Sequence, residues 1–143
     1  MKIGGHHYRT IWAENEGVRV INQTVLPFRF ETCLLTTSEA VAQAIRTMVV
    51  RGAPLIGATA AWGMALAMRE DASDRGLARA HKMLAATRPT AVNLHWALQR
   101  MSRVLQPMPV SSRVEASASE ARLICDEDVD CCRAIGAHGL EHI

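Results

Sequence analysis

The chain has 143 residues, of which 49% are apolar and 21% charged, so its composition is that of a globular protein rather than a disordered one. This length builds one average domain around a single core. The net charge is only +2, the fourteen arginines are scattered among acids, and no apolar run is long enough for a signal peptide or a membrane span. We therefore expect a cytoplasmic protein that binds neither nucleic acid nor membrane.

The four cysteines are too few for a disulfide framework in a chain of this length. Adjacent cysteines do not bridge each other sensibly, and no C-x-x-C pair is present. We expect all four to be reduced, buried, small apolar side chains: Cys33, Cys125, Cys131 and Cys132.

The N-terminal region is predicted to form strands. Residues 8–12 and 18–21 are short alternating runs, and the polar segment between them ends in Gly17, which suits a hairpin turn. Residues 28–36 form a third run, rich in aromatic and apolar side chains. Together these runs predict a small three-stranded antiparallel sheet.

The rest of the chain is predicted to be helical, because apolar residues recur at intervals of three and four. Thr37 or Ser38 is expected to cap the first helix, and Thr90 is expected to cap the fourth. The expected helices are 38–49, 54–68, 74–87, 91–105 and about 110 or 111 to 135. The predicted fold class is α+β and mainly helical, with a small three-stranded sheet followed by a bundle of about five helices.

Arg51 is followed by seventeen uncharged residues, and the segment Arg51-Gly52-Ala53-Pro54 is predicted to bind an anion. The first N–H groups of a helix lack partners and lie at the positive end of its dipole. Gly52 lets backbone approach a ligand closely, and the Arg51 guanidinium matches a phosphate bidentately. Alternatively, Arg51 only favours the C-terminus of the preceding helix and the segment is a connector.

A second arginine stands in the same relation to a helix start. Arg88 comes just before Pro89 and Thr90, as Arg51 comes before Pro54. Two such arginines at adjacent helix entrances are expected to converge on one phosphate group. The alternative is again a helix-capping arginine.

Three patterns resemble metal sites, yet we predict no metal. Residues 138–142 fit H-x-x-E-H, but Gly139 weakens the helix that this motif needs and no third ligand follows. The aspartates of residues 126–130 resemble the opening of a calcium loop, but Cys131 stands where that loop needs glycine. The pair at residues 6–7 has no further ligand at useful spacing.

Four segments together resemble the N-terminal portion of the methylthioribose-1-phosphate isomerase family, which is related to ribose-1,5-bisphosphate isomerase and to regulatory subunits of initiation factor 2B. The resemblance covers essentially the whole chain, and the second and third segments together are the specific signal. In chain order they are INQTVLP (21–27), VRGAPLIG (50–57), RPTAVNL (88–94) and CRAIGAHG (132–139).

The resemblance implies that residues 1–143 are the N-terminal domain of a longer, two-domain protein whose Rossmann-like catalytic domain is absent here. Such enzymes convert 5-methylthioribose 1-phosphate to 5-methylthioribulose 1-phosphate in methionine salvage, without a cofactor. Carried over residue by residue, the family's substrate-binding positions are Arg51, Gly52, Ala53 and Arg88. The implied partners are a sugar phosphate, the missing C-terminal domain and, for the full-length protein, a second copy in a homodimer.

The chain departs from the family pattern at two places. Asn22 stands where the family usually has aspartate. The family's catalytic cysteine and aspartate lie beyond residue 143, so we expect this chain alone to be inactive. The alternatives are a non-catalytic regulatory or sugar-phosphate-sensing relative of initiation factor 2B, a ribose-1,5-bisphosphate isomerase, or a purely structural helical module.

Overall fold

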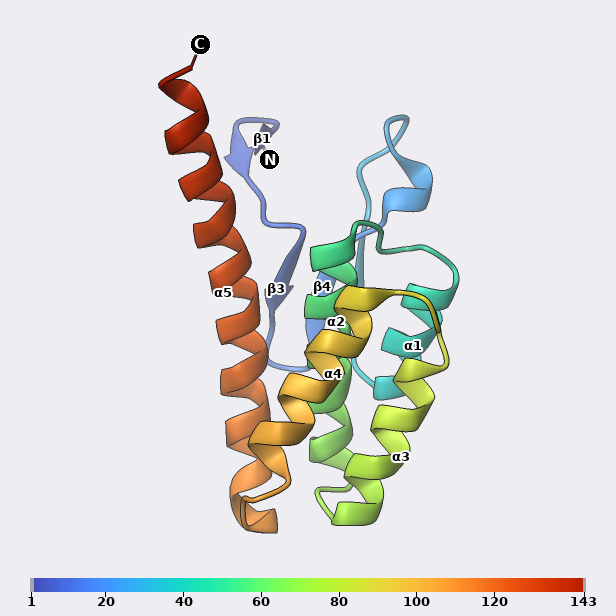
Figure 1. Ribbon diagram of the computed structural model, residues 1–143. Coiled ribbons are helices and arrows are strands. Elements are labelled where there is room, and N and C mark those ends of the chain that lie inside the picture. Colours follow the sequence, from blue (N-terminus) through green and yellow to red (C-terminus); the bar gives the residue numbers. More distant parts are fainter. Residues whose placement is uncertain (1, 143) are drawn as a thin grey trace.

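The computed structural model describes residues 2–142, which form a small β region followed by five α-helices (Figure 1). The strands are β1 (Lys2–Ile3), β2 (His6–His7), β3 (Ile11–Ala13), β4 (Val18–Ile21) and β5 (Thr32–Leu35). The α-helices are α1 (Ser38–Arg46), α2 (Ala53–Glu70), α3 (Asp74–Ala85), α4 (Val92–Leu105) and α5 (Arg113–Leu140). Two 3-10 helices are also present, η1 (Gln23–Val25) and η2 (Val110–Ser112). The predicted fold class is confirmed.

The expected three-stranded sheet is present, with the order β3-β4-β5 and antiparallel pairing throughout. The turn between β3 and β4 is closed by paired backbone hydrogen bonds between Glu14 and Gly17. Gly17 is required there, because a Cβ at this position would lie 2.1 Å from the Leu35 carbonyl oxygen. Val18 and Val20 of β4 are fully buried and attach the sheet to the helical core.

The β region differs from the prediction in three ways, one of which is that β3 covers residues 11–13 instead of 8–12. A separate two-stranded hairpin joins β1 and β2 through Gly4 and Gly5, both with positive φ, a glycine pair that fits a tight hairpin turn. The third strand of the main sheet covers only residues 32–35 instead of 28–36. Residues 23–29 form η1 and a turn in which Arg29 N donates to Val25 O, and Phe28 is left 92% exposed.

Helix α2 forms the centre of the bundle, as its uncharged sequence predicts. All of its residues from 55 to 68 are buried, and it contacts each of the other four α-helices. Gly63 allows this close packing, because a Cβ there would lie 2.8 Å from Val41 Cγ1 and 3.0 Å from both Leu84 methyl carbons. A helix surrounded in this way is a rigid support for a site at its end.

The helix starts confirm one expected cap and contradict another. Thr37 caps α1, since its hydroxyl oxygen accepts a hydrogen bond of 3.1 Å from Ala40 N. Thr90 does not cap α4: the helix begins at Val92 after Ala91, which has no capping side chain. The cause is a turn in which Ala91 N donates to Arg88 O, so the chain enters the helix one residue later than expected.

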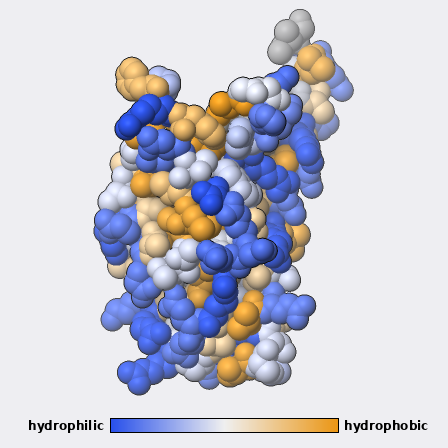
Figure 2. All heavy atoms as spheres, turned by 180° about the vertical axis from the view of Figure 1, so that it is seen from behind, coloured by the Kyte–Doolittle hydropathy of each residue, from blue (hydrophilic) through white to orange (hydrophobic). Residues whose placement is uncertain are grey.

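Helix α5 extends past the rest of the bundle (Figure 1). At its start, the buried Arg113 guanidinium donates hydrogen bonds to the carbonyl oxygens of Leu105, Gln106 and Ala72, and it forms an ion pair with Asp74. From residue 130 to 142 every residue is exposed. Seen from behind, this end and the loop after η1 form two projections with a hollow between them (Figure 2).

None of the helices within residues 2–142 is long and apolar enough to cross a membrane.

Candidate functional site: a cavity between two arginines

Arg51 lies in the short connection between α1 and α2, and both ends of this connection have unusual backbone. Met48 has φ 61° and Gly52 has φ 90°. Gln23 fixes the segment, because its main-chain N–H donates to Val49 O at 2.9 Å and its side-chain amide donates to Arg51 O at 3.5 Å. The connection is thus held at two points by one residue, and the Arg51 side chain is left exposed.

The first turn of α2 has N–H groups without helical partners, and one of them, that of Ala53, belongs to the same place. Gly52 is the N-cap and has no side chain to satisfy them, so the amides of Ala53 and Leu55 have no acceptor in the helix. Pro54 is the second helical residue rather than the first as expected, and it contributes no donor. A Cβ on Gly52 would meet no atom within 4 Å, so glycine is needed there for its positive φ and not because of crowding within the protein.

Arg88 lies in the turn between α3 and α4. The preceding Thr87 is buried, and both its amide and its hydroxyl donate to Leu84 O, which fixes the end of α3. The following turn is held by the bond from Ala91 N to Arg88 O and by a 2.8 Å contact between the His95 ring nitrogen Nε2 and Pro89 O. These contacts give the partly buried Arg88 a defined backbone position.

The two arginines line one cavity of about 330 Å³ at the entrances of α2 and α4. No Asp, Glu, His or Cys is among the described residues on its wall, and neither guanidinium makes a hydrogen bond or an ion pair within residues 2–142. The cavity therefore carries two positive charges that no acidic side chain neutralises. Its wall consists of Met48, Arg51, Gly52, Ala53, Ile56, Arg88, Ala91, Val92 and Asn93.

All four of the residues predicted for the site, Arg51, Gly52, Ala53 and Arg88, are thus on one cavity wall. Sequence reasoning missed Met48 and did not single out Asn93. Asn93 belongs to the segment 88–94 quoted above. It stands in the first turn of α4, directly after the turn that holds Arg88. Met48 gave no signal, because nothing in a residue's identity shows that its backbone is left-handed.

The approach of α2 to α4 that forms this cavity depends on Gly57. A Cβ there would lie 2.8 Å from the Asn93 carbonyl oxygen and 3.6 Å from Ala97 Cβ. No side chain larger than hydrogen fits this gap without displacing backbone. The lack of a side chain at Gly57 therefore lets the two helix entrances lie side by side.

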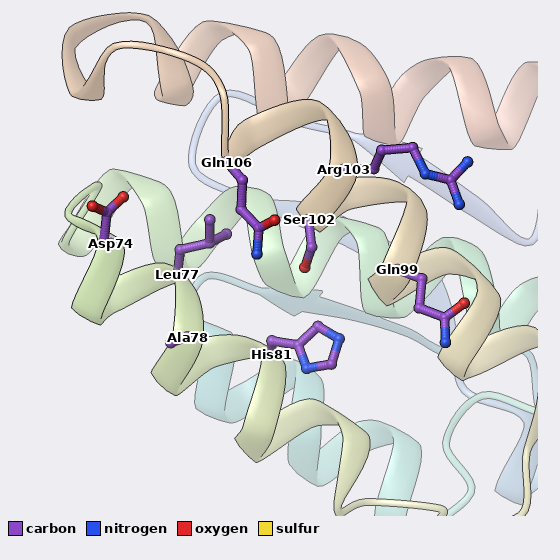
Figure 3. Close-up of a pocket in the computed structure, with 8 residues that line it drawn as sticks. All are labelled: Asp74, Leu77, Ala78, His81, Gln99, Ser102, Arg103 and Gln106. Atoms are coloured by element: carbon purple, nitrogen blue, oxygen red, sulfur yellow. The ribbon is translucent and has the colours of Figure 1, made fainter.

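A larger groove, of about 750 Å³, runs between α3 and α4 (Figure 3). Its wall is formed by Asp74, Leu77, Ala78 and His81 of α3, by Gln99, Ser102 and Arg103 of α4, and by Gln106 directly after α4. Only one arginine lines it, Arg103, and its wall also holds the acidic side chain of Asp74, which forms an ion pair with Arg113. Burial, and to a smaller extent the charge of His95, lowers the pKa of His81 below its ordinary value. This groove lacks the paired cations of the smaller cavity.

The other patterns considered in the sequence are placed away from the arginine cavity. Residues 6–7 and 126–142 are outside its wall, and no group of three or more His, Cys, Asp or Glu within residues 2–142 is arranged to hold a metal ion. The cysteines are free, but the expectation that all are buried is wrong. Cys33 and Cys125 are half-buried, and Cys131 and Cys132 are exposed because α5 has left the bundle by that point.

Asn22 caps η1. Its side-chain oxygen accepts hydrogen bonds from Thr24 N at 3.0 Å and from the Thr24 hydroxyl at 2.7 Å. Both bonds require only an acceptor oxygen, which asparagine and aspartate share. Asparagine therefore serves as well as aspartate for the capping of this loop.

Residues 49–143 match the Initiation factor 2 subunit family, and the chain belongs to this family. It is 61% identical over its whole length to a methylthioribose-1-phosphate isomerase of Methylobacterium nodulans, and it covers 40% of that protein. A second enzyme of the same name, from Rhodospirillum centenum, is 57% identical and is covered to 39%. The chain thus spans about two fifths of the length of these curated relatives.

A solved structure shares the fold at high similarity. The crystal structure of 5-methylthioribose 1-phosphate isomerase from Pyrococcus horikoshii OT3 matches with a TM-score of 0.87 and 38% identity, over 93% of this chain and 40% of that one.

Proposed function

We propose that the chain is the N-terminal, substrate-binding part of an aldose-ketose isomerase that converts 5-methylthioribose 1-phosphate to 5-methylthioribulose 1-phosphate. The observation that carries the proposal is the cavity shared by Arg51 and Arg88. Two guanidinium groups without acidic partners suit a phosphate dianion, because each offers a planar pair of N–H donors. The high identity to enzymes of this name over the whole chain supports the same substrate.

The free N–H groups at the start of α2 complete the phosphate site. The Ala53 amide lies at the positive end of an eighteen-residue helix, where an anion is stabilised. Gly52 leaves open space beside this amide, so a phosphoryl oxygen can reach it. Arg51, Gly52, Ala53 and Arg88 together form the proposed binding site.

The same cavity explains why we propose that residues 1–143 alone do not turn over substrate. Moving a proton between two sugar carbons needs an acid and a base placed beside them. The described part of the cavity wall has only arginines, an amide and apolar groups. The full-length protein would supply the missing acid and base from a second, Rossmann-like domain, and we propose that it works as a homodimer without a cofactor.

A second candidate is a non-catalytic, sugar-phosphate-sensing relative of initiation factor 2B. The crystal structure of translation initiation factor eIF-2B subunit delta from A. fulgidus favours it, with a TM-score of 0.79 and 36% identity over 86% of this chain. Both candidates use the arginine cavity to bind a phosphate ester. They differ in turnover by the full-length protein, which only the isomerase shows.

The proposal is tested by measuring the affinity of the chain for 5-methylthioribose 1-phosphate by calorimetry. Arg51→Ala and Arg88→Ala should each weaken binding at least tenfold, because a charge-assisted hydrogen bond contributes about 1.5–3 kcal/mol. Arg75→Ala is the matched control, since Arg75 is exposed on α3 and does not line the cavity. Unchanged affinity in both cavity variants would contradict the proposal and favour a structural helical module.

A further inference from the structure

Met48 has a backbone conformation that its residue type does not favour. It directly follows Thr47, the C-cap of α1, at the position where helices commonly place glycine. Its φ of 61° is the only positive value of a non-glycine residue within residues 2–142. Glycine would adopt this conformation without the steric conflict that a Cβ brings.

The strain at Met48 is not offset by packing of its side chain in the core. It is 40% exposed and lies outside the buried cluster of the bundle. Instead it lines the cavity that holds Arg51 and Arg88. Strained residues that persist without a packing reason are characteristic of ligand sites.

The cavity wall has an apolar part as well as its two cations. Met48, Ile56, Ala91 and Val92 line it together, and Val92 is 78% exposed. A phosphate ion gains nothing from such a surface, because its oxygens need hydrogen-bond donors. A phosphate ester with an apolar substituent would use both parts of the wall at once.

We infer that Met48 is a specificity-determining residue, whose thioether side chain contacts an apolar group on the phosphate ester bound by Arg51 and Arg88. This inference rests on the proposed function of the cavity. A methionine suits the role, because its unbranched and polarizable side chain adapts to the shape of a ligand. Met48 would select between sugar phosphates that differ in an apolar group and leave the affinity for the phosphate group itself unchanged.

The test compares wild type, Met48→Gly and Met48→Leu in calorimetric titrations with 5-methylthioribose 1-phosphate, ribose 1-phosphate and inorganic phosphate. Wild type should prefer the methylthio ester over ribose 1-phosphate about tenfold, the lower end of what one or two apolar groups contribute in a pocket. Met48→Gly should lose this preference and keep the affinity for inorganic phosphate. It should not melt at a much lower temperature, because relief of the positive φ offsets the entropy that glycine adds to the unfolded chain. Met48→Leu should retain the preference.

Two outcomes would overturn the inference in different ways. If wild type and Met48→Gly discriminate equally between the two esters while all variants bind inorganic phosphate, Met48 has no role in selection and the proposed function stands. If wild type binds neither inorganic phosphate nor either ester, the phosphate site fails and this inference fails with it.

Discussion

The backbone of Gly57 in α2 lies against that of Asn93 in α4 so closely that a Cβ on Gly57 would be 2.8 Å from the Asn93 carbonyl oxygen. Gly57→Ala must therefore push the start of α4 away from α2, and with it Arg88 from Arg51. We predict a loss of stability of about 1–3 kcal/mol, typical of overpacking in a core, and weaker phosphate binding. Urea denaturation and a phosphate titration measure the two effects.

Gly136→Ala is the matched control for this change. Gly136 is also a helical glycine, but a Cβ there would meet nothing within 4 Å. Alanine should stabilise α5 by up to about 1 kcal/mol through helix propensity and leave phosphate binding unchanged. If Gly57→Ala behaved like this control, the close contact between α2 and α4 would not control the spacing of the arginines.

Gly52→Ala should impair the site for a different reason, which is conformation. The new Cβ meets no atom within 4 Å, but φ 90° is unfavourable for alanine and costs of the order of 1–2 kcal/mol. The segment should relax toward negative φ and turn the Ala53 amide away from the cavity. Phosphate affinity should fall while the circular dichroism spectrum stays native. Full affinity in this variant would show that the backbone amides do not contact the anion.

Arg113 should contribute more to stability than its partner Asp74. The Arg113 side chain is 3% exposed and donates to three carbonyl oxygens, whereas the Asp74 side chain is 89% exposed. Arg113→Ala removes the donors to all three carbonyls, of which only Leu105 O keeps another one, Met108 N, so we predict a loss of about 2–4 kcal/mol. Asp74→Asn should cost at most about 1 kcal/mol, as for other solvent-exposed ion pairs. Equal losses in urea denaturation would show that the ion pair, and not the carbonyl bonds, anchors α5.

The stability of the fold should fall on mild acidification because of His81. Burial lowers its pKa in the folded chain below the ordinary value, so the unfolded chain takes up the proton first as the pH falls. The contribution is therefore complete above the ordinary pKa of histidine and is lost as the pH drops through the lowered one. His81→Gln should reduce the fall in melting temperature between pH 7 and pH 5. An identical pH profile in both proteins would contradict the lowered pKa.

The fold was predictable from sequence where a single pattern controls it. The uncharged run of residues 55–68 predicts a buried central helix because it has no charged face to turn to solvent. Thr37 was predictable as the cap of α1 because it stands directly before the apolar-periodic residues. The start of α4 was not predictable from Thr90, because the backbone bond from Ala91 N to Arg88 O competes with capping. The exposure of Cys131 and Cys132 depends on where the bundle ends, which no local pattern shows.

The candidate site was predictable as two separate helix entrances, each with an arginine, and their placement on one cavity follows from packing. Gly57 is a weak signal in the sequence, since a glycine inside a helix has many explanations. Only the structure shows that the Asn93 backbone occupies the space that a side chain at residue 57 would need. Met48 could not be predicted as a site residue at all, because its place on the cavity goes with a positive φ that methionine seldom adopts.

The most direct test of the central claim follows the Nε–H resonances of Arg51 and Arg88 by NMR while inorganic phosphate is added to the 143-residue chain. Both arginines should shift with one common dissociation constant, and Arg88→Ala should raise the dissociation constant measured at Arg51 at least tenfold, because the two guanidinium groups bind the same anion. Shifts with two different dissociation constants, or an unchanged dissociation constant at Arg51 in Arg88→Ala, would show that the arginines do not share a phosphate.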